Sequence, residues 1–355
     1  MSKSTIFFYK LLITWYLSNK RDLPWRKTKD PYRIWLSEII LQQTRVLQGL
    51  PYYNAFIERF PTVFELADAH QQDVLKLWQG LGYYSRARNL HETAQYIAGE
   101  CQGKFPANYE GLLKLKGVGD YTASAVASIC FGENTAVVDG NVYRVLSRVF
   151  GIKEPINTAK GVKLFKSLAQ ELLDGEQPGT YNQAVMEFGA RYCVPSNPDC
   201  TSCIFKEKCE AFRTQTVSEL PVKLKKTRVK KHYFNFLVCL SETGETLLEQ
   251  RTEKGIWQQL YQFPLIDSVH LLSKEQLEAT SSFKKITEKF DIHSIVKFNE
   301  TPILHKLSHK DLHTTFWILE TGSLPSSRIP VEEIHLYPVP VLLENFISTF
   351  PSFKE

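Results

Sequence analysis

Apolar residues in the first 213 positions recur at helical spacing, with short breaks at glycine and proline. Residues 6–17 form an apolar segment interrupted by Lys10, which predicts an amphipathic first helix. Later apolar runs lead directly into turns that contain two glycines each, at 80–82 and 117–119. Because alternation with a period of two residues is rare in this half of the chain, the pattern predicts an all-α region.

The pattern changes to that of a mixed α and β domain after residue 232. Alternating apolar and polar positions predict strands, and one longer stretch, residues 273–290, predicts a single helix. The predicted strands cover 233–240, 245–251, 294–299 and 312–320. The second half is therefore expected to be an α+β domain.

A basic stretch, residues 214–232, separates these two halves. Its cations are Lys223, Lys225, Lys226, Arg228, Lys230 and Lys231. It is only weakly apolar, so we expect a linker, and its charge would allow it to contact a nucleic-acid backbone. The predicted organisation is a first domain at 1–213, a linker at 214–232 and a second domain at 233–355.

Composition places the chain among globular proteins and only narrows the choice of partner. Of its 355 residues, 43% are apolar and 12% aromatic, which is enough to build two cores. The formal charge of +5 is compatible with a polyanionic partner but does not identify one. The apolar segments are too short to cross a membrane and no cleavage site follows the first one, so we expect a cytoplasmic protein without membrane association.

A glycine turn at Gly117 and Gly119 precedes a helix rich in small residues. Glycines at a helix entry leave N–H groups pointing outward, and these groups together with the helix dipole favour a phosphate. A Gly-x-Gly turn alone is usually only a tight connection. Here a carboxylate, Asp139, follows 20 residues later between a pair of valines and a glycine. The turn indicates a hairpin that binds one nucleic-acid phosphate, and its combination with this aspartate is less common than the turn alone.

Four cysteines lie within 17 residues at the spacing C-x6-C-x2-C-x5-C: Cys193, Cys200, Cys203 and Cys209. Four thiolates in so short a loop can surround one metal centre, and disulfides are uncommon in a cytosolic protein. Both tetrahedral zinc and an iron–sulfur cluster use four thiolates. Spacing alone does not separate these two possibilities.

Together, five segments resemble the helix-hairpin-helix DNA glycosylases of the endonuclease III superfamily, and within them the MutY-type adenine glycosylases. They are the segments 36–44, 80–90, 115–125 and 137–145 and the cysteine loop. The resemblance covers nearly all of the first 213 residues. It implies that the loop 193–209 carries a 4Fe–4S cluster.

The resemblance also implies a pair of catalytic carboxyl groups. Cleavage of the bond between sugar and adenine leaves a poor anionic leaving group and a cation-like sugar. Glu38 lies in an apolar helical segment, where burial raises a carboxyl pKa, so it is the expected acid. Asp139 is the expected ionised partner. Considered singly, Glu38 would be a surface residue and Asp139 a turn or cap residue.

Other site residues follow from the resemblance position by position. Tyr121 occupies the place of the lysine that forms a Schiff base in glycosylase–lyase relatives, so a monofunctional enzyme is expected. Asn141 matches the asparagine that supports the catalytic aspartate, and Gln43 and Tyr83 match residues that enter the base stack. Expected pocket residues are Trp25, Arg26, Gln183 and Glu187, and expected phosphate contacts are Gly117, Gly119, Arg86 and Arg88.

The second domain resembles Nudix hydrolases less closely. Segment 255–264 is similar to a glycine-to-aromatic segment of the family, but no cluster of metal-binding carboxylates lies between Gly255 and Phe290. We therefore predict no pyrophosphohydrolase activity. The family reads 8-oxoguanine with a Phe-Ser-His loop. Here the corresponding residues are Leu307, Ser308 and His309, so a ring that could stack is missing.

These observations predict an adenine DNA glycosylase of base excision repair. Its expected partner is double-stranded DNA with adenine opposite 8-oxoguanine or guanine, and we expect a monomer. Two alternatives remain open at this stage. One is a pyrimidine-lesion glycosylase with lyase activity, which Tyr121 argues against. The other is a non-catalytic DNA-binding iron–sulfur protein, which the presence of both Glu38 and Asp139 argues against.

Overall fold

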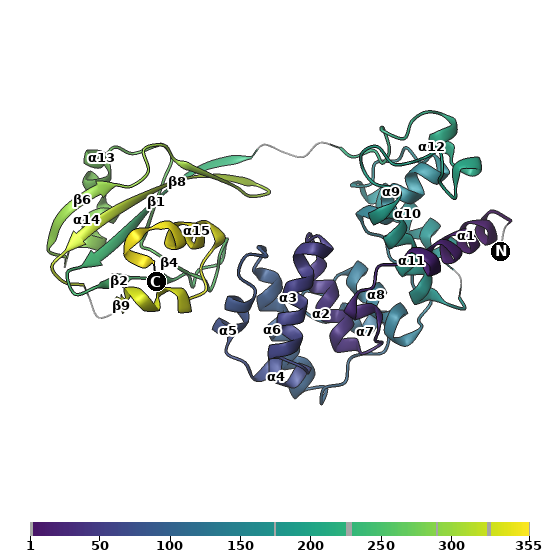
Figure 1. The fold of residues 1–355 in the computed structure, drawn as a ribbon, viewed down its shortest axis with the longest axis horizontal. Helices are drawn as coiled ribbons and strands as arrows, with labels where there is room; N and C mark the ends of the chain where they lie inside the picture. The colour runs from purple at the N-terminus through teal and green to yellow at the C-terminus, as the bar shows by residue number, and fades with distance from the viewer. Residues whose placement is uncertain (1–2, 174, 225–228, 289, 325–327, 355) are drawn as a thin grey trace. The chain divides into compact units, whose positions relative to one another are not determined.

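The computed structural model describes residues 3–173, 175–224, 229–288, 290–324 and 328–354. The chain divides into two compact units (Figure 1). One unit consists of 1–68 and 89–225, and the other of 69–88 and 226–355. The second unit thus contains a segment that comes from the middle of the helical half of the sequence. Of the basic linker residues, Lys225, Lys226 and Arg228 lie outside the described residues.

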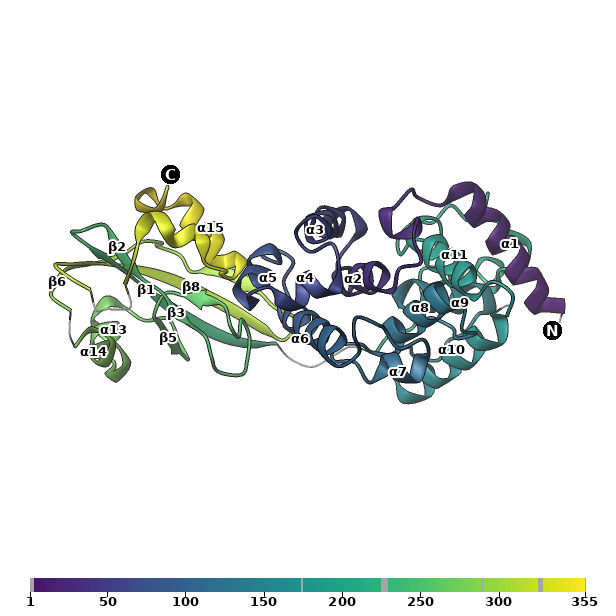
Figure 2. The same ribbon diagram turned by 90° about the horizontal axis from the view of Figure 1, so that it is seen from below.

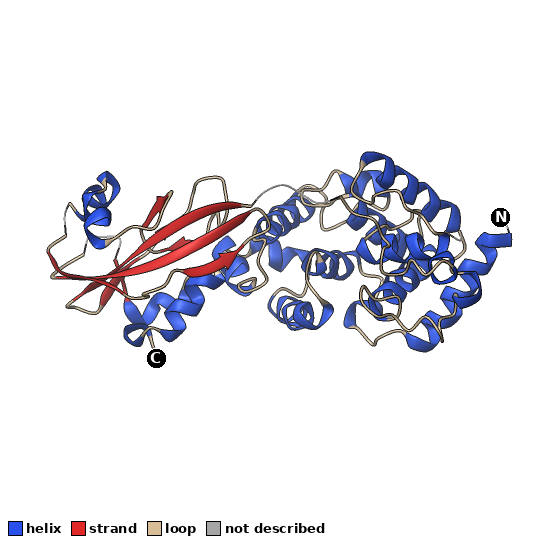
Figure 3. Cartoon of the chain, turned by 90° about the horizontal axis from the view of Figure 1, so that it is seen from above, coloured by secondary structure: helices blue, strands red, loops and turns tan. Residues whose placement is uncertain are grey.

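The first unit is helical, and its described residues contain no strand (Figure 3), which confirms the predicted all-α fold. Its α-helices are α1 (Lys3–Asn19), α2 (Pro31–Leu41), α3 (Val46–Arg59), α4 (Val63–Asp68), α7 (Tyr109–Leu113), α8 (Asp120–Phe131), α9 (Gly140–Phe150), α10 (Ala159–Leu172), α11 (Pro178–Arg191) and α12 (Glu210–Arg213). Helix α6 (Ser85–Gly99) belongs mostly to this unit, and 3₁₀ turns cover Pro24–Arg26 and Lys206–Lys208. No described helix of the chain is long and apolar enough to cross a membrane.

Helices α2, α8, α9 and α11 pack together and hold the residues of the predicted site. Helix α2 begins at a proline, and the side chain of Asp30 caps it by accepting from the Tyr32 amide at 3.0 Å. Helix α11 approaches the start of α9 closely, because a Cβ on Gly189 would lie 2.7 Å from Asn141. Only glycine permits this approach, which places the two helices at contact distance.

The second unit is built on a mixed seven-stranded sheet with the order β6-β8-β1-β2-β9, in which β5 also pairs with β1 and β7 with β8. The central strands β1 and β8 are parallel, and the other pairs are antiparallel. The strands are β1 (Lys230–Ser241), β2 (Glu245–Leu247), β5 (Leu265–Ser268), β6 (Ile292–Lys297), β7 (Ile303–Lys306), β8 (Lys310–Thr321) and β9 (Arg328–Pro330), with a separate ladder of β3 (Glu249–Gln250) and β4 (Tyr261–Gln262). Its helices are α5 (Gln71–Leu77), α13 (Lys274–Ala279), α14 (Ser281–Thr287) and α15 (Val341–Thr349), with 3₁₀ turns at Val331–Leu336 and Pro351–Phe353.

The two faces of this sheet are covered by different helices (Figure 2). On one face Leu237 and Trp317 belong to the core that includes residues of α13 and α14. On the other face Phe316 stacks on Phe346 of α15, with ring centres 4.0 Å apart. Because successive strand residues point to opposite faces, Phe316 packs into one core and its neighbour Trp317 into the other. The predicted α+β second domain is confirmed.

Two predicted elements are wrong in detail. The single helix expected over 273–290 is two helices, because Thr280 ends α13 and its hydroxyl accepts from the Phe283 amide at 3.1 Å to cap α14. The single strand expected over 245–251 is interrupted at Leu248, and its two parts pair with different partners, β9 and β4. Strand β1 begins at Lys230, within the stretch predicted to be linker.

Candidate active site

Glu38 is a buried carboxylic acid on α2, with 6% of its surface exposed. Burial raises its pKa to about 7, and the nearby charge of Asp139 acts in the same direction, while the neighbouring Tyr121 hydroxyl and the charge of Arg26 oppose the shift. Among the described residues, its buried Oε2 has no hydrogen-bond partner. A carboxyl group in this state is ready to hold a proton near neutral pH and to transfer it to a group that enters the site.

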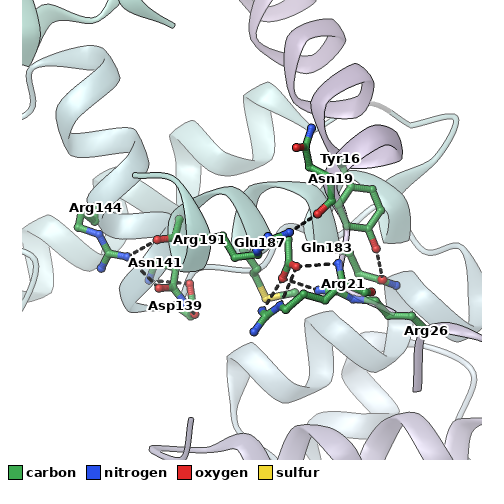
Figure 4. Close-up of polar contacts among 12 residues, drawn as sticks. Tyr16, Asn19, Arg21, Arg26, Asp139, Asn141, Arg144, Gln183, Glu187 and Arg191 are labelled. Carbon is green, nitrogen blue, oxygen red and sulfur yellow. Dashed lines mark hydrogen bonds and ion pairs between the residues drawn. The ribbon is translucent and has the colours of Figure 1, made fainter. Parts of the chain in front are cut away.

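Asp139 caps the N-terminus of α9 (Figure 4). Its Oδ1 accepts from the amides of Asn141 at 2.9 Å and Val142 at 2.8 Å, and its Oδ2 accepts from the Asn141 side chain at 2.7 Å. Burial raises its pKa, but these donors oppose the shift because they stabilise the ionised form. Asp139 therefore has the capping role expected of an isolated aspartate and is also fixed in orientation.

Glu38 and Asp139 line the same cavity, which has a volume of about 150 Å³. The other predicted residues along this cavity are Trp25, Arg26, Tyr121, Asn141, Gln183 and Glu187. Residues from α2, α8, α9 and α11 thus meet here. Eight of the predicted site residues are brought together by the fold.

Tyr121 is half-buried and lines the cavity together with the two carboxyl groups. Burial raises its pKa well above its ordinary value, and the charges of Glu38 and Asp139 reinforce the effect, so the phenol stays neutral. Its hydroxyl donates to Met186 Sδ at 3.2 Å. Tyr121 is therefore a neutral, fixed side chain on the cavity wall.

One wall of the cavity is a buried ion pair centred on Glu187 (Figure 4). Its Oε2 accepts from Arg21 at 2.5 Å and from Arg26 at 2.7 Å, and its Oε1 accepts from Arg21 Nε at 2.8 Å. Burial acts to raise the Glu187 pKa, but the hydrogen bonds from the two arginines outweigh it and lower the pKa to about 2. Beside this pair, Gln183 accepts a hydrogen bond from Tyr16 at 2.7 Å. Arg21 and Tyr16 were not predicted, because no local motif marks them.

A second unpredicted residue, Arg144, supports the Asp139 side of the cavity. Its Nη2 donates to Asn141 Oδ1 at 2.9 Å and to the Gly189 carbonyl at 2.6 Å, and its Nε donates to the Cys193 carbonyl at 2.7 Å. Arg144 lies three residues after Asn141 on α9, so the two side chains share one face of the helix. This spacing is the sequence signal that could have indicated Arg144.

The glycine turn that is predicted to contact a phosphate lies at the start of α8. Gly117 has φ of +75° and its Cα faces Asn89, where an added Cβ would lie 2.7 Å from the Asn89 side chain. Gly119 is the N-cap residue of α8, and no side chain caps this end of the helix. Gln43 lies in the turn that follows α2, is exposed and has φ of 57°.

Three of the predicted base-contacting residues lie in the second unit. Tyr83 is 49% exposed with φ of 47°, and it lines a cavity of about 510 Å³ together with Ser308 and His309. The last two occupy the turn between β7 and β8, where the Ser308 hydroxyl lies 3.2 Å from His309 Nδ1.

The structure does not support Arg86 as a phosphate contact. Arg86 is buried, stacks on Trp78 at 4.9 Å, and donates to the carbonyls of Leu81 and Gly82. Its guanidinium stabilises the turn from the inside, and burial lowers its pKa to about 10. Arg88 donates to the Gln258 carbonyl at 2.8 Å and is also half-buried.

The four cysteines of the predicted cluster loop are half-buried free thiols. Burial, together with the neighbouring cysteines, raises the pKa of Cys203 to about 12. Donors already point at two of the sulfurs: Arg148 Nη1 lies 3.5 Å from Cys193 Sγ, and the Phe205 amide lies 3.4 Å from Cys203 Sγ. Such donors stabilise thiolates, so this set fits an iron–sulfur cluster. Among the described residues no three side chains of cysteine, histidine, aspartate or glutamate converge on one point where a single ion would bind.

Comparison with protein families identifies both halves of the chain. A model described as the HhH-GPD superfamily of base excision DNA repair proteins matches residues 36–171, and a NUDIX domain model matches residues 235–349. An adenine DNA glycosylase of Buchnera aphidicola (subsp. Schizaphis graminum) is 35% identical over 308 residues, which cover 85% of this chain and 88% of that protein. The human adenine DNA glycosylase is 45% identical over 210 residues, covering 56% of this chain and 38% of that one.

Solved structures resemble the helical half. A thermostable thymine-DNA glycosylase is 30% identical with a TM-score of 0.56, over 60% of this chain and 98% of that one. An endonuclease III trapped as a covalent intermediate with DNA has a TM-score of 0.53 at 19% identity, over 61% and 99% of the two chains. The second likeness concerns the fold alone.

Proposed function

The chain belongs to the adenine DNA glycosylase family of base-excision repair enzymes, and we propose that its substrate is duplex DNA in which adenine lies opposite 8-oxoguanine or guanine. The observation that carries this proposal is the cavity shared by Glu38 and Asp139. The buried Oε2 of Glu38 has no hydrogen-bond partner within the part of the chain that the structure describes, and the carboxylate of Asp139 accepts three hydrogen bonds. The adenine would be flipped out of the duplex into this cavity, because its reacting bond is inaccessible within the base stack.

In the proposed reaction Glu38 donates its proton to N7 of the adenine while the bond between C1′ and N9 breaks. The bonding electron pair leaves with the base, which the proton neutralises. Asp139 stabilises the resulting cationic sugar by its negative charge or by a transient bond to C1′. Water then adds to C1′ and returns a proton to Glu38, which leaves an abasic site. The pKa of Glu38, about 7, supports its role as the acid.

Tyr121 supports a monofunctional enzyme. A lyase reaction begins with an amine that forms an imine with the sugar, and a phenol cannot form one. The neutral Tyr121 side chain instead packs beside both carboxyl groups. A pyrimidine-lesion glycosylase with lyase activity is the alternative, and borohydride trapping of a covalent DNA adduct would favour it.

We also propose that Cys193, Cys200, Cys203 and Cys209 hold a 4Fe–4S cluster. The donors near Cys193 Sγ and Cys203 Sγ would stabilise the thiolate ligands of such a cluster, and the family resemblance favours it over a single zinc ion. When bound, the cluster ties four points of the loop together and can exchange an electron.

Recognition of the base opposite the adenine is assigned to the cavity of the second unit. Ser308 and His309 offer polar groups to a base, and the exposed ring of Tyr83 offers a stacking surface on another wall of the same cavity. Leu307 supplies no ring at the third position. We therefore expect the Ser308 and His309 side chains to account for most of the preference for 8-oxoguanine. The DNA-bound protein is expected to be a monomer.

The test is a single-turnover assay of base release from duplexes that differ only in the base opposite the adenine. We expect fast release opposite 8-oxoguanine, slower release opposite guanine, and little opposite thymine. The variant carrying Ser308→Ala and His309→Ala should narrow the difference between 8-oxoguanine and guanine while leaving release opposite guanine nearly unchanged. Equal rates opposite all bases would contradict the proposed specificity. Absence of release from every duplex would instead favour a non-catalytic DNA-binding protein.

A further inference from the structure

The segment that carries Tyr83 belongs structurally to the C-terminal part of the chain. Residues 69–88 pack with 226–355 in one compact unit, although they lie in the helical half of the sequence. This segment contains α5 and the turn that leads into α6. Its contacts with the C-terminal part of the chain therefore lie within one compact unit.

Gln79 is the main attachment at the start of the turn. Its Oε1 accepts from the Val339 amide at 3.1 Å, and its Nε2 donates to the carboxylate of Glu344 on α15. The Tyr84 hydroxyl adds a link, because it accepts from the Gly80 amide at 3.4 Å and donates to the Val339 carbonyl at 3.3 Å. Lys76 donates to the Tyr337 carbonyl at 3.3 Å. The start of the turn is thus held by residues 337–344.

Arg88 holds the other end of the turn at a second place. Its Nη1 donates to the Gln258 carbonyl, in a loop where Trp257 and Gln259 both have positive φ, of 60° and 67°. A bulky residue such as tryptophan adopts this conformation only when its surroundings enforce it. Arg88 therefore joins the Tyr83 turn to a loop that is itself conformationally fixed.

Between these two attachments the turn has an unusual backbone. Gly80 and Gly82 have φ of 96° and 72°, and Tyr83 has φ of 47°, which is costly for a residue with a side chain. The ring of Tyr83 is half exposed and faces a cavity whose other walls include Trp257 and Ser308. The turn and the opposite wall of this cavity thus both belong to the second unit.

We propose that Gln79 and Arg88 are positioning residues through which the C-terminal part of the chain fixes Tyr83 relative to the base opposite the adenine. This inference depends on the proposed function, because it assigns Tyr83 to that base. It adds a second route by which the C-terminal part determines specificity. Besides offering Ser308 and His309, that part holds the stacking residue of the helical half in place.

The first experiment measures how strongly these attachments restrict the turn, in the full-length protein without DNA. Amide hydrogen exchange of residues 80–84 is compared in wild type, Gln79→Ala, Glu344→Ala and Glu344→Gln. We expect faster exchange in the two alanine variants and near wild-type exchange in Glu344→Gln, which keeps an acceptor for Gln79. Asn345→Ala, at an exposed neighbour on α15, is the matched control. Unchanged exchange in Gln79→Ala, with the protein still folded, would overturn the proposal.

The second experiment measures binding to duplexes that contain an uncleavable 2′-fluoroadenosine opposite 8-oxoguanine or guanine. Gln79→Ala should reduce the affinity ratio between the two by about 3- to 30-fold. In a Tyr83→Ala background the same substitution should cause no further loss, because its effect passes through Tyr83. Additive losses would show that Gln79 acts elsewhere and would overturn the proposal. A wild-type protein without preference for 8-oxoguanine would contradict the proposed function instead, and the exchange data would still decide whether the turn is held.

Discussion

The guanidinium of Arg144 lies 2.9 Å from the side-chain oxygen of Asn141, whose amide group in turn donates to Asp139 at 2.7 Å. Its other partners are main-chain carbonyls, among them that of Cys193 at 2.7 Å. The orientation of Asp139, the proposed catalytic aspartate, and the position of the first cysteine of the loop therefore depend on the same side chain. Because all partners are neutral acceptors, the arginine charge is distributed over hydrogen bonds without a carboxylate in direct contact.

Replacing Arg144 by methionine should slow base release and also weaken metal retention. The substitution preserves much of the side-chain length but leaves buried acceptors of Asn141 and Cys193 unpaired. We expect a loss of about 10- to 100-fold in the single-turnover rate, as is typical for residues that orient ligands or catalytic groups. Metal content per chain is measured on the same samples. The control is Arg213→Met, which removes an exposed arginine paired with Glu210, and equal behaviour of the two variants would contradict this coupling.

Glu38→Gln should separate catalysis from binding. Glutamine is similar in size and neutral like the protonated acid, but it has no proton to give to the leaving base. Base release is expected to fall by about 10²- to 10⁴-fold, the usual contribution of general acid catalysis. Affinity for the A:8-oxoguanine duplex should stay close to wild type in an equilibrium binding assay. Glu58→Gln, at an exposed position of α3, serves as the control, and near-normal release by Glu38→Gln would refute the assignment of the acid.

The pH dependence follows from the same residue. The pKa of Glu38 is about 7 in the folded protein against an ordinary 4.5, so the folded state binds this proton more tightly than the unfolded state does. Activity that needs the protonated acid should therefore fall as pH rises through about 7. Stability should fall earlier, between about pH 4.5 and 7, because in this interval the unfolded state releases the proton that the folded state still binds.

Glu38→Gln removes this cost of ionisation. At pH 8 the variant should be more stable than wild type, by at most on the order of 3 kcal/mol, and below pH 4.5 the difference should vanish. Melting curves of the two proteins across this interval measure the effect. A stability difference that is independent of pH would mean that Glu38 does not titrate as described.

Cavity residues could be predicted from the sequence when they stand in a recognisable local pattern. Glu38 stands in an apolar helical segment and Asp139 precedes a glycine at a helix start, and the fold brings both to one cavity. Glu187 was an expected pocket residue, but its pairing with Arg21 could not be foreseen, since 166 positions separate the two residues and no motif marks Arg21. Thr280 shows a different limit, because a single capping residue divided a helix that apolar spacing alone predicted to be continuous.

No pattern in the sequence predicted that residues 69–88 pack with the C-terminal part of the chain. Periodicity correctly predicts a helix for part of this segment, but it does not show which partner covers that helix. Apart from the bond between Gln79 and Glu344, the attachments described above are hydrogen bonds to main-chain groups, such as those of Val339 and Gln258. Such acceptors and donors exist at almost every residue, so the sequence does not mark them.

Metal analysis should find an iron–sulfur cluster in the purified protein. We expect about four iron and four sulfide per chain together with visible absorbance, as for a 4Fe–4S cluster with four thiolate ligands. Replacing Cys203 by alanine should remove this absorbance, whereas replacing Cys239, a buried cysteine of the second unit, should leave it unchanged. One zinc per chain without iron would contradict the assignment.

Lys166 is expected to keep the hairpin able to bind a phosphate. The helix that begins after Gly119 has a carboxylate, Asp120, as its first residue, where a bound phosphate would be repelled. Lys166 on α10 pairs with this carboxylate, and Tyr109 donates to it at 2.5 Å. The charge of Asp120 is thereby compensated beside the predicted phosphate site.

A double-mutant cycle tests this compensation. Lys166→Met should weaken binding to an undamaged duplex at low salt, by about 3- to 10-fold for the loss of one nearby cation. In an Asp120→Asn background the same change should cost less, because no carboxylate is then exposed. Lys163→Met removes an exposed cation from the same helix and is the control for nonspecific charge loss. If Lys166→Met weakens binding equally in both backgrounds, Lys166 contributes only its own positive charge and does not act by neutralising Asp120.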